Sequence, residues 1–437
     1  MTDFRVIVLG AGPAGLFTAH ALAAAGIDFV VLERQAKIVR FRGALLVLFP
    51  PLVRLLDQLG LYKPTLAYTT RLTTKASFTH DGEPLCNGPV FEAIEEELGY
   101  PSIALSRGNW LRILYENLPG RATKVRPNAH AVKIETQTDG VRVHLADGSV
   151  VEGSVVIAAD GVHSPARALI QRLEKHGSAA PSPMVPTYLS LFGVTRGVRA
   201  DVTLGDFAES HGPGTVSQSM RLPDAMYFTV LKRLDGPPPG DQRFTSEEAD
   251  KFAREMADLT IFPGVKLREV WPRREEASTV LLHQEEGLAD KWHHGRVVLV
   301  GDAAHKTTSV TGQGAFLGAL SAVALVNCLR ATLRRSPRPS TADLEAAFAA
   351  YQASRVAHAT AVVALGGEMT RFTTWAGEDD EALDRKESDS KTLAEETVKR
   401  FVPAFSQCPI LDFIPFHSQR GKTPWAVDCE PSARPRL

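Results

Sequence analysis

The sequence predicts an α/β protein in which a mostly parallel sheet is interrupted by an antiparallel sheet and followed by helices. Two apolar runs, Phe4–Leu9 and Phe29–Leu32, flank a glycine-rich turn and a helical segment. Short strand patterns separated by turns then fill residues 181–288. From about Thr341 to Arg371 the pattern is that of one long helix. We therefore expect a nucleotide-binding domain in two parts, 1–180 and 289–333, around an inserted domain, 181–288, with a C-terminal helical region, 334–437.

The composition argues against several classes of protein. The chain has 437 residues, with 49 Lys and Arg against 50 Asp and Glu, so nothing suggests binding of nucleic acid. Four scattered cysteines form no C-x-x-C pair, and the histidines lack ligand spacing, so we expect no metal and a reducing, cytoplasmic location. The first strand begins too early for a signal peptide. The longest apolar stretch, Gly314–Leu329, falls short of the roughly 20 residues that span a bilayer, so no stable membrane insertion is expected.

The first apolar run leads into Gly10-Ala11-Gly12-Pro13-Ala14-Gly15, a G-x-G-x-x-G sequence. Gly10 permits the tight turn, Gly12 lets the backbone approach a pyrophosphate, and Gly15 lets helix and strand pack closely. A helix over 16–25 would direct its N-terminal N–H groups at the phosphates. Glu33, at the end of the second strand, can accept hydrogen bonds from ribose hydroxyls. These features predict a Rossmann-like site for an adenine dinucleotide, either FAD or NAD.

The remaining elements follow in order. Helices are expected over 45–60, 110–118 and 247–259, and Asp-Gly turns predict a meander of strands at 131–136, 141–145 and 150–158. Asp160–Arg167 then reads D-G-x-x-S-x-x-R. The inserted strands are placed at 187–195, 215–221, 226–233 and 278–283. A strand at 296–300 leads into G-D-A-A-H and G-Q-G, which open another helix, and 378–390 is expected to be a loop.

Three motifs, G-A-G-P-A-G with Glu33, D-G-x-x-S-x-x-R and G-D-A-A-H…G-Q-G, resemble those of FAD-dependent monooxygenases of the para-hydroxybenzoate hydroxylase type. Within that group, Phe192-Gly193, K-W-H-H-G-R, His305-Lys306 and the tail L-D-F-I-P…T-P-W are similar to the fungal indole-diterpene and meroterpenoid epoxidase branch. The resemblance implies a Rossmann-like FAD-binding domain with 181–288 as the substrate domain.

The resemblance also implies roles for individual residues. Asp302 would bind the ribityl chain, Asp160 would hold its loop, and the helix after Gly312 would direct its positive end at the flavin. His305 would be structural, and Tyr227 is the residue we would assign a catalytic role. The cofactor-binding residues would be Gly10, Gly12, Ala14, Gly15, Glu33, Arg34, Arg42, Gly43, Arg107, Asp160, Asp302, Gly312, Gly314 and Ala315.

The chemistry implied by the resemblance is insertion of one oxygen atom into a small, apolar secondary-metabolite intermediate. NADPH reduces FAD, oxygen adds at flavin C4a, and the hydroperoxide delivers the oxygen atom, while the protein orients the substrate and excludes water. No acid–base pair is evident, and an alkene needs none, which favours epoxidation over aromatic hydroxylation. The substrate, NADPH against NADH, and the oligomeric state stay open.

Several positions depart from the family pattern. Ser309 and Phe316 are expected beside the flavin ring, Leu320 replaces a common carboxylate, Pro51 replaces a common Asn, and Leu189 lies in an apolar strand where relatives often carry a cation. These departures motivate an alternative function, a redox-silent FAD-binding cyclase or pericyclase. A flavin halogenase is weaker, because no W-x-W-x-I-P motif is present. The apolar tail segment Cys408–Phe416 is expected to pack on the substrate domain as a lid.

Overall fold

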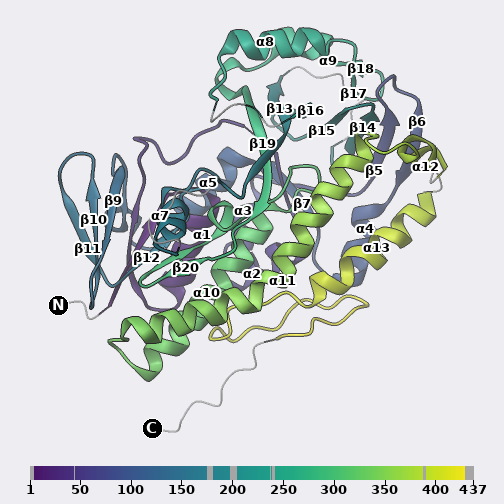
Figure 1. Ribbon diagram of the computed structural model, residues 1–437. Coiled ribbons are helices and arrows are strands. Elements are labelled where there is room, and N and C mark those ends of the chain that lie inside the picture. Colours follow the sequence, from purple (N-terminus) through teal and green to yellow (C-terminus); the bar gives the residue numbers. More distant parts are fainter. Residues whose placement is uncertain are drawn as a thin grey trace.

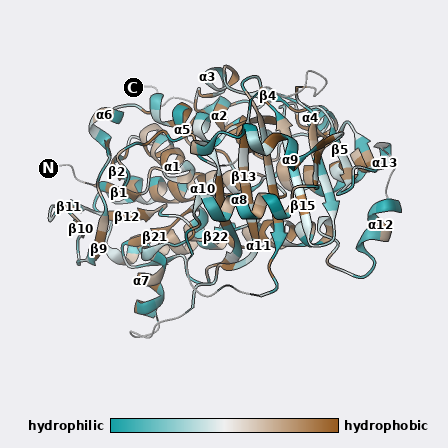
Figure 2. Cartoon of the chain, turned by 90° about the horizontal axis from the view of Figure 1, so that it is seen from above, coloured by the Kyte–Doolittle hydropathy of each residue, from teal (hydrophilic) through white to brown (hydrophobic). Residues whose placement is uncertain are grey.

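The computed structural model describes residues 4–43, 45–174, 181–196, 204–236, 238, 242–386 and 390–428. It has the predicted α/β architecture: a sheet of mostly parallel strands, a large second sheet, and long C-terminal helices that cross both (Figure 1). Hydrophobic colour is concentrated in the interior strands and in α1 (Pro13–Ala24), whereas the peripheral helices α6 (Arg121–Lys124) and α12 (Asp380–Lys386) are hydrophilic (Figure 2).

The nucleotide-binding sheet has six strands in the order β20-β21-β12-β1-β2-β8. All of its pairs are parallel except that between β20 and β21. Leu9 pairs with Leu32 and Ala158, and Ala158 pairs with Leu299, so these strands end at one edge. The motifs that follow them therefore meet at that edge. The bounds are β1 Arg5–Leu9, β2 Asp28–Leu32, β8 Val125–Arg126, β12 Val155–Ala158, β20 His293–His294 and β21 Val297–Leu299.

Helix α10 (Gly314–Arg335) packs between α1 and α11 (Thr341–Thr373). Of the described residues, those of α10 alone form a helix long and apolar enough to cross a membrane, but 72% of its most apolar window is buried inside the protein. This burial is what a core helix requires, because an interior helix is apolar on every side.

The second sheet has eight strands in the order β22-β19-β13-β16-β15-β14-β5-β6. Its outer face packs Leu191, Phe228 and Val230 against helix α8 (Ser246–Glu255). Its inner face carries Tyr188 and Leu231 and turns toward the nucleotide-binding motifs. The strands are β5 Lys75–Thr79, β6 Pro84–Gly88, β13 Val185–Thr195, β14 Phe207–Gly212, β15 Thr215–Arg221, β16 Met226–Arg233, β19 Val280–Leu288 and β22 His305–Lys306.

The smaller elements complete the fold. A three-stranded sheet, β3-β7-β4, and a meander, β11-β10-β9, flank the large sheets. Their bounds are β3 Leu45–Leu48, β4 Thr70–Arg71, β7 Ile103–Ser106, β9 Ala131–Thr136, β10 Val141–Leu145 and β11 Val150–Gly153, with a hairpin of β17 Thr260–Phe262 and β18 Val265–Lys266. The remaining helices are α2 Pro50–Gln58, α3 Tyr62–Leu66, α4 Val90–Leu98, α5 Arg107–Glu116, α7 Pro165–Glu174, α9 Leu267–Val270 and α13 Ser390–Ser406.

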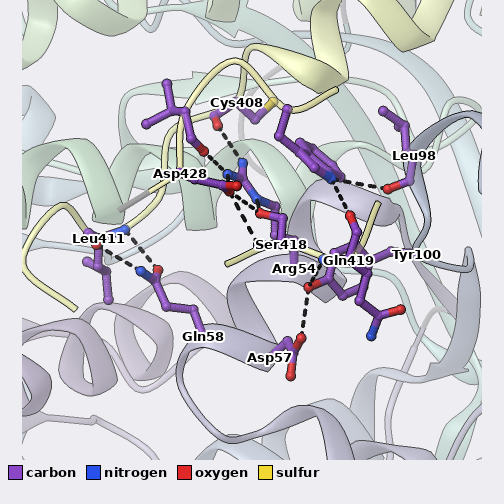
Figure 3. A network of polar contacts seen from close by, with 12 residues as sticks. Arg54, Asp57, Gln58, Leu98, Tyr100, Cys408, Leu411, Ser418, Gln419 and Asp428 are labelled. Atoms are coloured by element: carbon purple, nitrogen blue, oxygen red, sulfur yellow. Dashed lines mark hydrogen bonds and ion pairs between the residues drawn. The ribbon is translucent and has the colours of Figure 1, made fainter. Parts of the chain in front are cut away.

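The tail after α13 is bound to α2 and α4 through a buried arginine (Figure 3). The guanidinium of Arg54, which is 0% exposed, donates to Ser418 Oγ at 2.6 Å, to the Cys408 carbonyl at 3.1 Å and to the Val427 carbonyl, and it stacks 4.3 Å from the centre of the Trp425 ring. Trp425 Nε1 in turn donates to the Leu98 carbonyl at the end of α4. The expected lid on the substrate domain is therefore wrong, because the tail packs on the nucleotide-binding side.

Four secondary-structure predictions need correction. The single helix expected over 45–60 is strand β3 followed by α2, which begins at Pro50, where proline suits the first helical turn. The single strand over 150–158 is broken, because the chain turns at Ser154 from the meander into the parallel sheet. The loop expected over 378–390 contains helix α12. Strands β14, β5 and β6 were missed, and β5 and β6 come from the range assigned to the first nucleotide-binding part. The domain boundaries themselves stay a prediction.

Candidate active site

The glycine-rich turn has the geometry that its sequence predicts. Gly10 has a φ of +96°, and a Cβ there would lie 2.6 Å from the Ala159 carbonyl oxygen. A Cβ on Gly15 would lie 1.9 Å from the Gly10 carbonyl oxygen, so strand and helix touch through backbone. A Cβ on Gly12 would meet nothing within 4 Å, and Gly12 caps α1 without a side-chain acceptor. Open space therefore lies beside the N-terminus of α1, the kind of position at which unpaired helical N–H groups bind an anion. Ala14 does not face that space directly, since its Cβ lies within 2.7 Å of where a Gly301 Cβ would be.

Glu33 binds the same turn. Its buried carboxylate accepts hydrogen bonds from the backbone N–H groups of Ala11 and Gln35, both at 2.9 Å. Two donors leave lone pairs on each oxygen, so ribose hydroxyls can still be accepted. The neighbouring Arg34 is exposed.

Arg107 lies near Arg40 and near the carboxylates of Glu33 and Asp302. Arg107 begins α5, where burial and the nearby Arg40 lower its pKa, while Asp302 and Glu33 raise it. Arg40 has a buried Nε with no partner among the described residues, and the sequence prediction missed it. Arg42, which was predicted, is exposed, and Gly43 (φ +89°) donates its N–H to the Ser278 carbonyl at 3.2 Å. The loop containing Arg42 therefore connects the nucleotide-binding side to the start of β19.

The D-G-x-x-S-x-x-R motif holds two loops together. Ser164 Oγ accepts the Arg167 N–H at 2.9 Å and Asp160 Oδ2 accepts the Ala166 N–H at 3.2 Å, which caps the start of α7. The buried Arg167 side chain donates to the Ala303 carbonyl at 3.1 Å, inside G-D-A-A-H. Burial raises the pKa of Asp160, whose Oδ1 is buried without a partner among the described residues.

In the third motif, Asp302 forms an ion pair with Lys306, with Oδ2 and Nζ 3.1 Å apart. His305 is buried and bonds through Nε2 to Ser321 Oγ at 2.8 Å. Burial lowers the pKa of His305 to about 3, so its ring is neutral at physiological pH. These contacts fit the structural role expected for His305, because a ring with so low a pKa, bonded inside the core, is too weak a base to take up a proton.

The G-Q-G turn forms the N-terminus of α10. Gly312 has a φ of +65°, and Gln313, the N-cap residue, is 1% exposed with no partner for its Nε2 among the described residues. Ser309 Oγ and Thr311 Oγ1 are likewise buried without partners. A Cβ on Gly314 would meet nothing within 4 Å, and Ala315 is partly exposed. Polar atoms thus converge on a helix N-terminus.

Tyr227 lies on the inner face beside the first turn of α5. Its hydroxyl donates to Asp224 Oδ2 at 3.3 Å, and burial, with the nearby Asp224 carboxylate, raises the pKa of Tyr227 to about 12. The phenol therefore stays protonated and can donate a hydrogen bond but not act as a base. Two of the departures lie elsewhere: Leu189 packs with the outer cluster under α8, and Phe316, 0% exposed, stacks edge-on against Phe405.

The family follows from the sequence comparisons. The protein-family model described as “FAD binding domain” matches residues 3–365, which contain all three motifs. The chain belongs to this FAD-binding family. The FAD-dependent monooxygenase srdH of Neurospora crassa is 37% identical over 97% of this chain and 98% of its own length. The FAD-dependent monooxygenase spyC of Aspergillus fumigatus is 35% identical over 77% of this chain and 72% of its own length. The protein is therefore an FAD-dependent monooxygenase by family, similar to enzymes of fungal secondary-metabolite clusters, as the sequence motifs predicted.

Solved structures show the same fold. HpxO of Klebsiella pneumoniae, in complex with FAD and uric acid, has a TM-score of 0.72 and 24% identity, over 92% of this chain and 95% of that one. The Diels-Alderase PyrE3 of pyrroindomycin biosynthesis has a TM-score of 0.69 and 24% identity, over 90% of this chain and 79% of that one. Similarity at this level of identity establishes the fold and not the reaction.

The polar groups near the glycine-rich turn and the G-Q-G turn suit the binding of FAD. Gly12 leaves open space beside its turn, and Asp160 Oδ1 and Gln313 Nε2 have no partner among the described residues, so an acceptor and a donor are free for a ligand. Gly10, Glu33, Asp160 and Asp302 follow strands that end at one edge of the parallel sheet, whereas Arg34 and Arg42 are exposed. Among the described residues no group of His, Cys, Asp and Glu could hold a metal ion.

Proposed function

We propose that the protein is an NAD(P)H-dependent FAD monooxygenase that inserts one oxygen atom into an apolar secondary-metabolite intermediate, by epoxidation or hydroxylation. The observation that carries this proposal is the contact between the inner face of the eight-stranded sheet and the cofactor motifs. Gln218 of that face bonds to the Val310 carbonyl, and Val310 packs against Tyr188, Val216 and Leu231. The substrate would bind between this face and the flavin.

Bound FAD, reduced by the nicotinamide cofactor, supplies the oxygen-activating chemistry. The residues of this chain bind and orient it: Gly12 and the α1 N-terminus would hold the pyrophosphate, Glu33 the adenosine ribose and Asp302 the ribityl chain. The N-terminus of α10, from Gly312 to Ala315, would direct its positive end at the ring, where it stabilises negative charge on the reduced cofactor. NADPH would approach through the same domain, since the sequence has no second G-x-G-x-x-G.

An apolar substrate and epoxidation are favoured by the chemistry of the inner face. Tyr227 is protonated, and burial lowers the pKa of His305 to about 3, so neither can take a proton from a phenol at physiological pH. An alkene can accept electrophilic oxygen without prior deprotonation. Tyr227 would instead orient the substrate through its hydroxyl. We further infer one small-molecule substrate, no nucleic-acid partner and a cytoplasmic location.

A redox-silent cyclase or pericyclase remains the second candidate. It was motivated by Ser309, Phe316 and Leu189, but Leu189 lies on the outer face and Phe316 in the core. Only the buried, unpartnered Ser309 hydroxyl still supports an altered flavin environment. We therefore rank this function below oxygenation.

Anaerobic stopped-flow mixing of the FAD-loaded protein with NADPH or NADH tests the proposal. Bleaching of the oxidised flavin, followed by substrate-dependent oxygen consumption on aeration, is expected. A flavin that stays oxidised with both nucleotides, with and without extracts containing candidate substrates, contradicts a monooxygenase. Conversion of a substrate under strict anaerobiosis without nucleotide would instead support the cyclase.

A further inference from the structure

The inner face of the eight-stranded sheet carries a polar row across three neighbouring strands. The register pairs Gln218 on β15 with Thr229 on β16 and with Glu209 on β14. Cross-strand partners point to the same side of a sheet, so these three side chains adjoin one another. On either side the row is flanked by apolar pairs, Val216–Leu231 and Met220–Tyr227. Glu209 and Thr229 are buried and Gln218 is partly exposed, so Gln218 is the member of the row that a ligand can reach.

The amide of Gln218 is fixed in orientation by two acceptors. Its Nε2 lies 2.6 Å from Glu209 Oε2 and 2.7 Å from the Val310 carbonyl oxygen. Neither partner can donate at neutral pH, so both N–H bonds of the amide are used and the nitrogen must lie on this side. Oε1 therefore points away, accepts no hydrogen bond from the described residues, and belongs to a side chain that is only partly buried.

The charges behind Gln218 cancel. Glu209, 1% exposed, is bound by Lys75 Nζ at 2.6 Å and by His211 Nε2 at 2.8 Å, and His211 Nδ1 lies 2.7 Å from Asp384 Oδ2. With the histidine protonated, two cations face two carboxylates. The cluster therefore leaves no net charge to bind an ionic substrate, and its effect on the site passes through the neutral amide.

The polar row also contacts the loop of the third sequence motif, through Gln218. Val310 follows Ser309 and precedes the G-Q-G turn, so the amide of Gln218 is anchored to the loop between the two halves of the third motif. A group bound at Gln218 Oε1 is thereby held at a fixed position relative to that loop.

We propose that Gln218 orients the substrate at a second point besides Tyr227, by accepting a hydrogen bond through Oε1 from the hydroxyl group of an otherwise apolar, uncharged alcohol. This inference rests on the proposed function, because it assigns the substrate class of the same site. Lys75, Glu209 and His211 are positioning residues that hold the amide.

The test is equilibrium binding to the oxidised FAD-loaded protein, read from the flavin absorbance without nucleotide. The probes are polyprenyl alcohols of three lengths (geraniol, farnesol and geranylgeraniol) and their methyl ethers, which lack the donor. At least one alcohol should bind about fivefold more tightly than its ether, which is the usual effect of one hydrogen bond. In Gln218→Met that preference should vanish while the ether's affinity stays unchanged.

Ser190→Ala provides a matched control, since Ser190 lies on the same face but is 0% exposed and cannot reach a ligand. It should keep the preference for the alcohol. Equal binding of alcohol and ether by the unaltered protein, a preference that survives in Gln218→Met, or no binding of any probe would overturn the inference. None of these outcomes depends on flavin reduction, so a failure of the monooxygenase proposal in the stopped-flow experiment is seen separately.

Discussion

The ammonium group of Lys306 lies 3.1 Å from the carboxylate of Asp302, four residues before it. Burial alone would lower the pKa of Lys306, but Asp302 and Glu285 raise it, so the lysine stays charged. The carboxylate that we assign to the ribityl chain is therefore already held in place by a cation. A pre-positioned carboxylate needs no rearrangement to accept ribityl hydroxyls.

Replacing Asp302 by Ala should weaken FAD binding about tenfold or more. The loss of a charge-assisted hydrogen bond amounts to about 1.5–3 kcal/mol. Asp302→Asn, which keeps one acceptor oxygen, should lose less. FAD occupancy after dialysis, measured by absorbance against protein concentration, checks both variants. Full occupancy in Asp302→Ala would show that the ribityl chain lies elsewhere.

The second prediction concerns the tail. Arg54→Met should reduce the free energy of unfolding by about 1.5–3 kcal/mol, because the buried Cys408 carbonyl and the Val427 carbonyl lose a charged donor. Urea unfolding of the FAD-loaded protein, and the rate of proteolysis within the tail, measure this effect.

Lys422→Ala is the control for the tail, because its ion pair with Glu96 lies on the surface and should matter little. If Arg54→Met matched Lys422→Ala in both measurements, the tail would be held by other contacts. Deleting 408–437 would be a poor test of a lid, since Ile410 and Leu411 belong to the main core.

A third prediction follows from the buried cluster around His211. Burial would lower the pKa of His211, but its hydrogen bonds to Asp384 and Glu209 outweigh this and raise it. A raised pKa stabilises the fold fully below the unfolded value of about 6.5, and that contribution is lost as pH rises through the folded value. For Glu209 burial raises the pKa, but Lys75 and His211 lower it overall, so its contribution is present above the unfolded value and is lost as pH falls through the folded value.

Thermal unfolding between about pH 5 and 9, for the unaltered protein and for His211→Gln, tests the direction of the pKa shift of His211. The difference in Tm should be largest near pH 5–6 and shrink toward alkaline pH. A difference that stays constant over this range would mean that folding does not change the pKa of His211, and a difference that grows with pH would mean that its pKa is lowered in the folded protein.

The sequence predicted the features that are local along the chain. Gly10, Gly15 and Glu33 are fixed by one strand–turn–helix–strand unit, so their spacing alone specifies the turn, and the parallel register then aligns Asp160 and Asp302 with it. Contacts between distant segments left no such pattern. Strand β5 joins β14 across more than a hundred residues, and Lys75 meets Glu209 only through that pairing.

The sequence also failed to show which side chains of a strand lie on the inner face of the eight-stranded sheet. Leu189 and Tyr188 are neighbours in a strand whose two faces are both largely apolar, so alternation could not show which side meets the substrate. Arg54 gave no signal either, because its partners Cys408, Ser418 and Val427 lie more than 350 residues away.

The last prediction separates folding from cofactor binding within one motif. Gly12 has a φ of −76°, which any residue can adopt, and a Cβ there meets no atom within 4 Å, so Gly12→Ala should leave the stability of the FAD-free protein unchanged. It should still weaken FAD binding, because the added methyl group occupies the space that we assign to the pyrophosphate.

Gly15→Ala is the opposite case. Its Cβ would lie 1.9 Å from the Gly10 carbonyl oxygen, so helix and strand must separate and the FAD-free protein itself should lose stability. Thermal unfolding of the FAD-free proteins and FAD titration of Gly12→Ala measure the two effects. Unchanged FAD affinity in Gly12→Ala would place the pyrophosphate away from this turn.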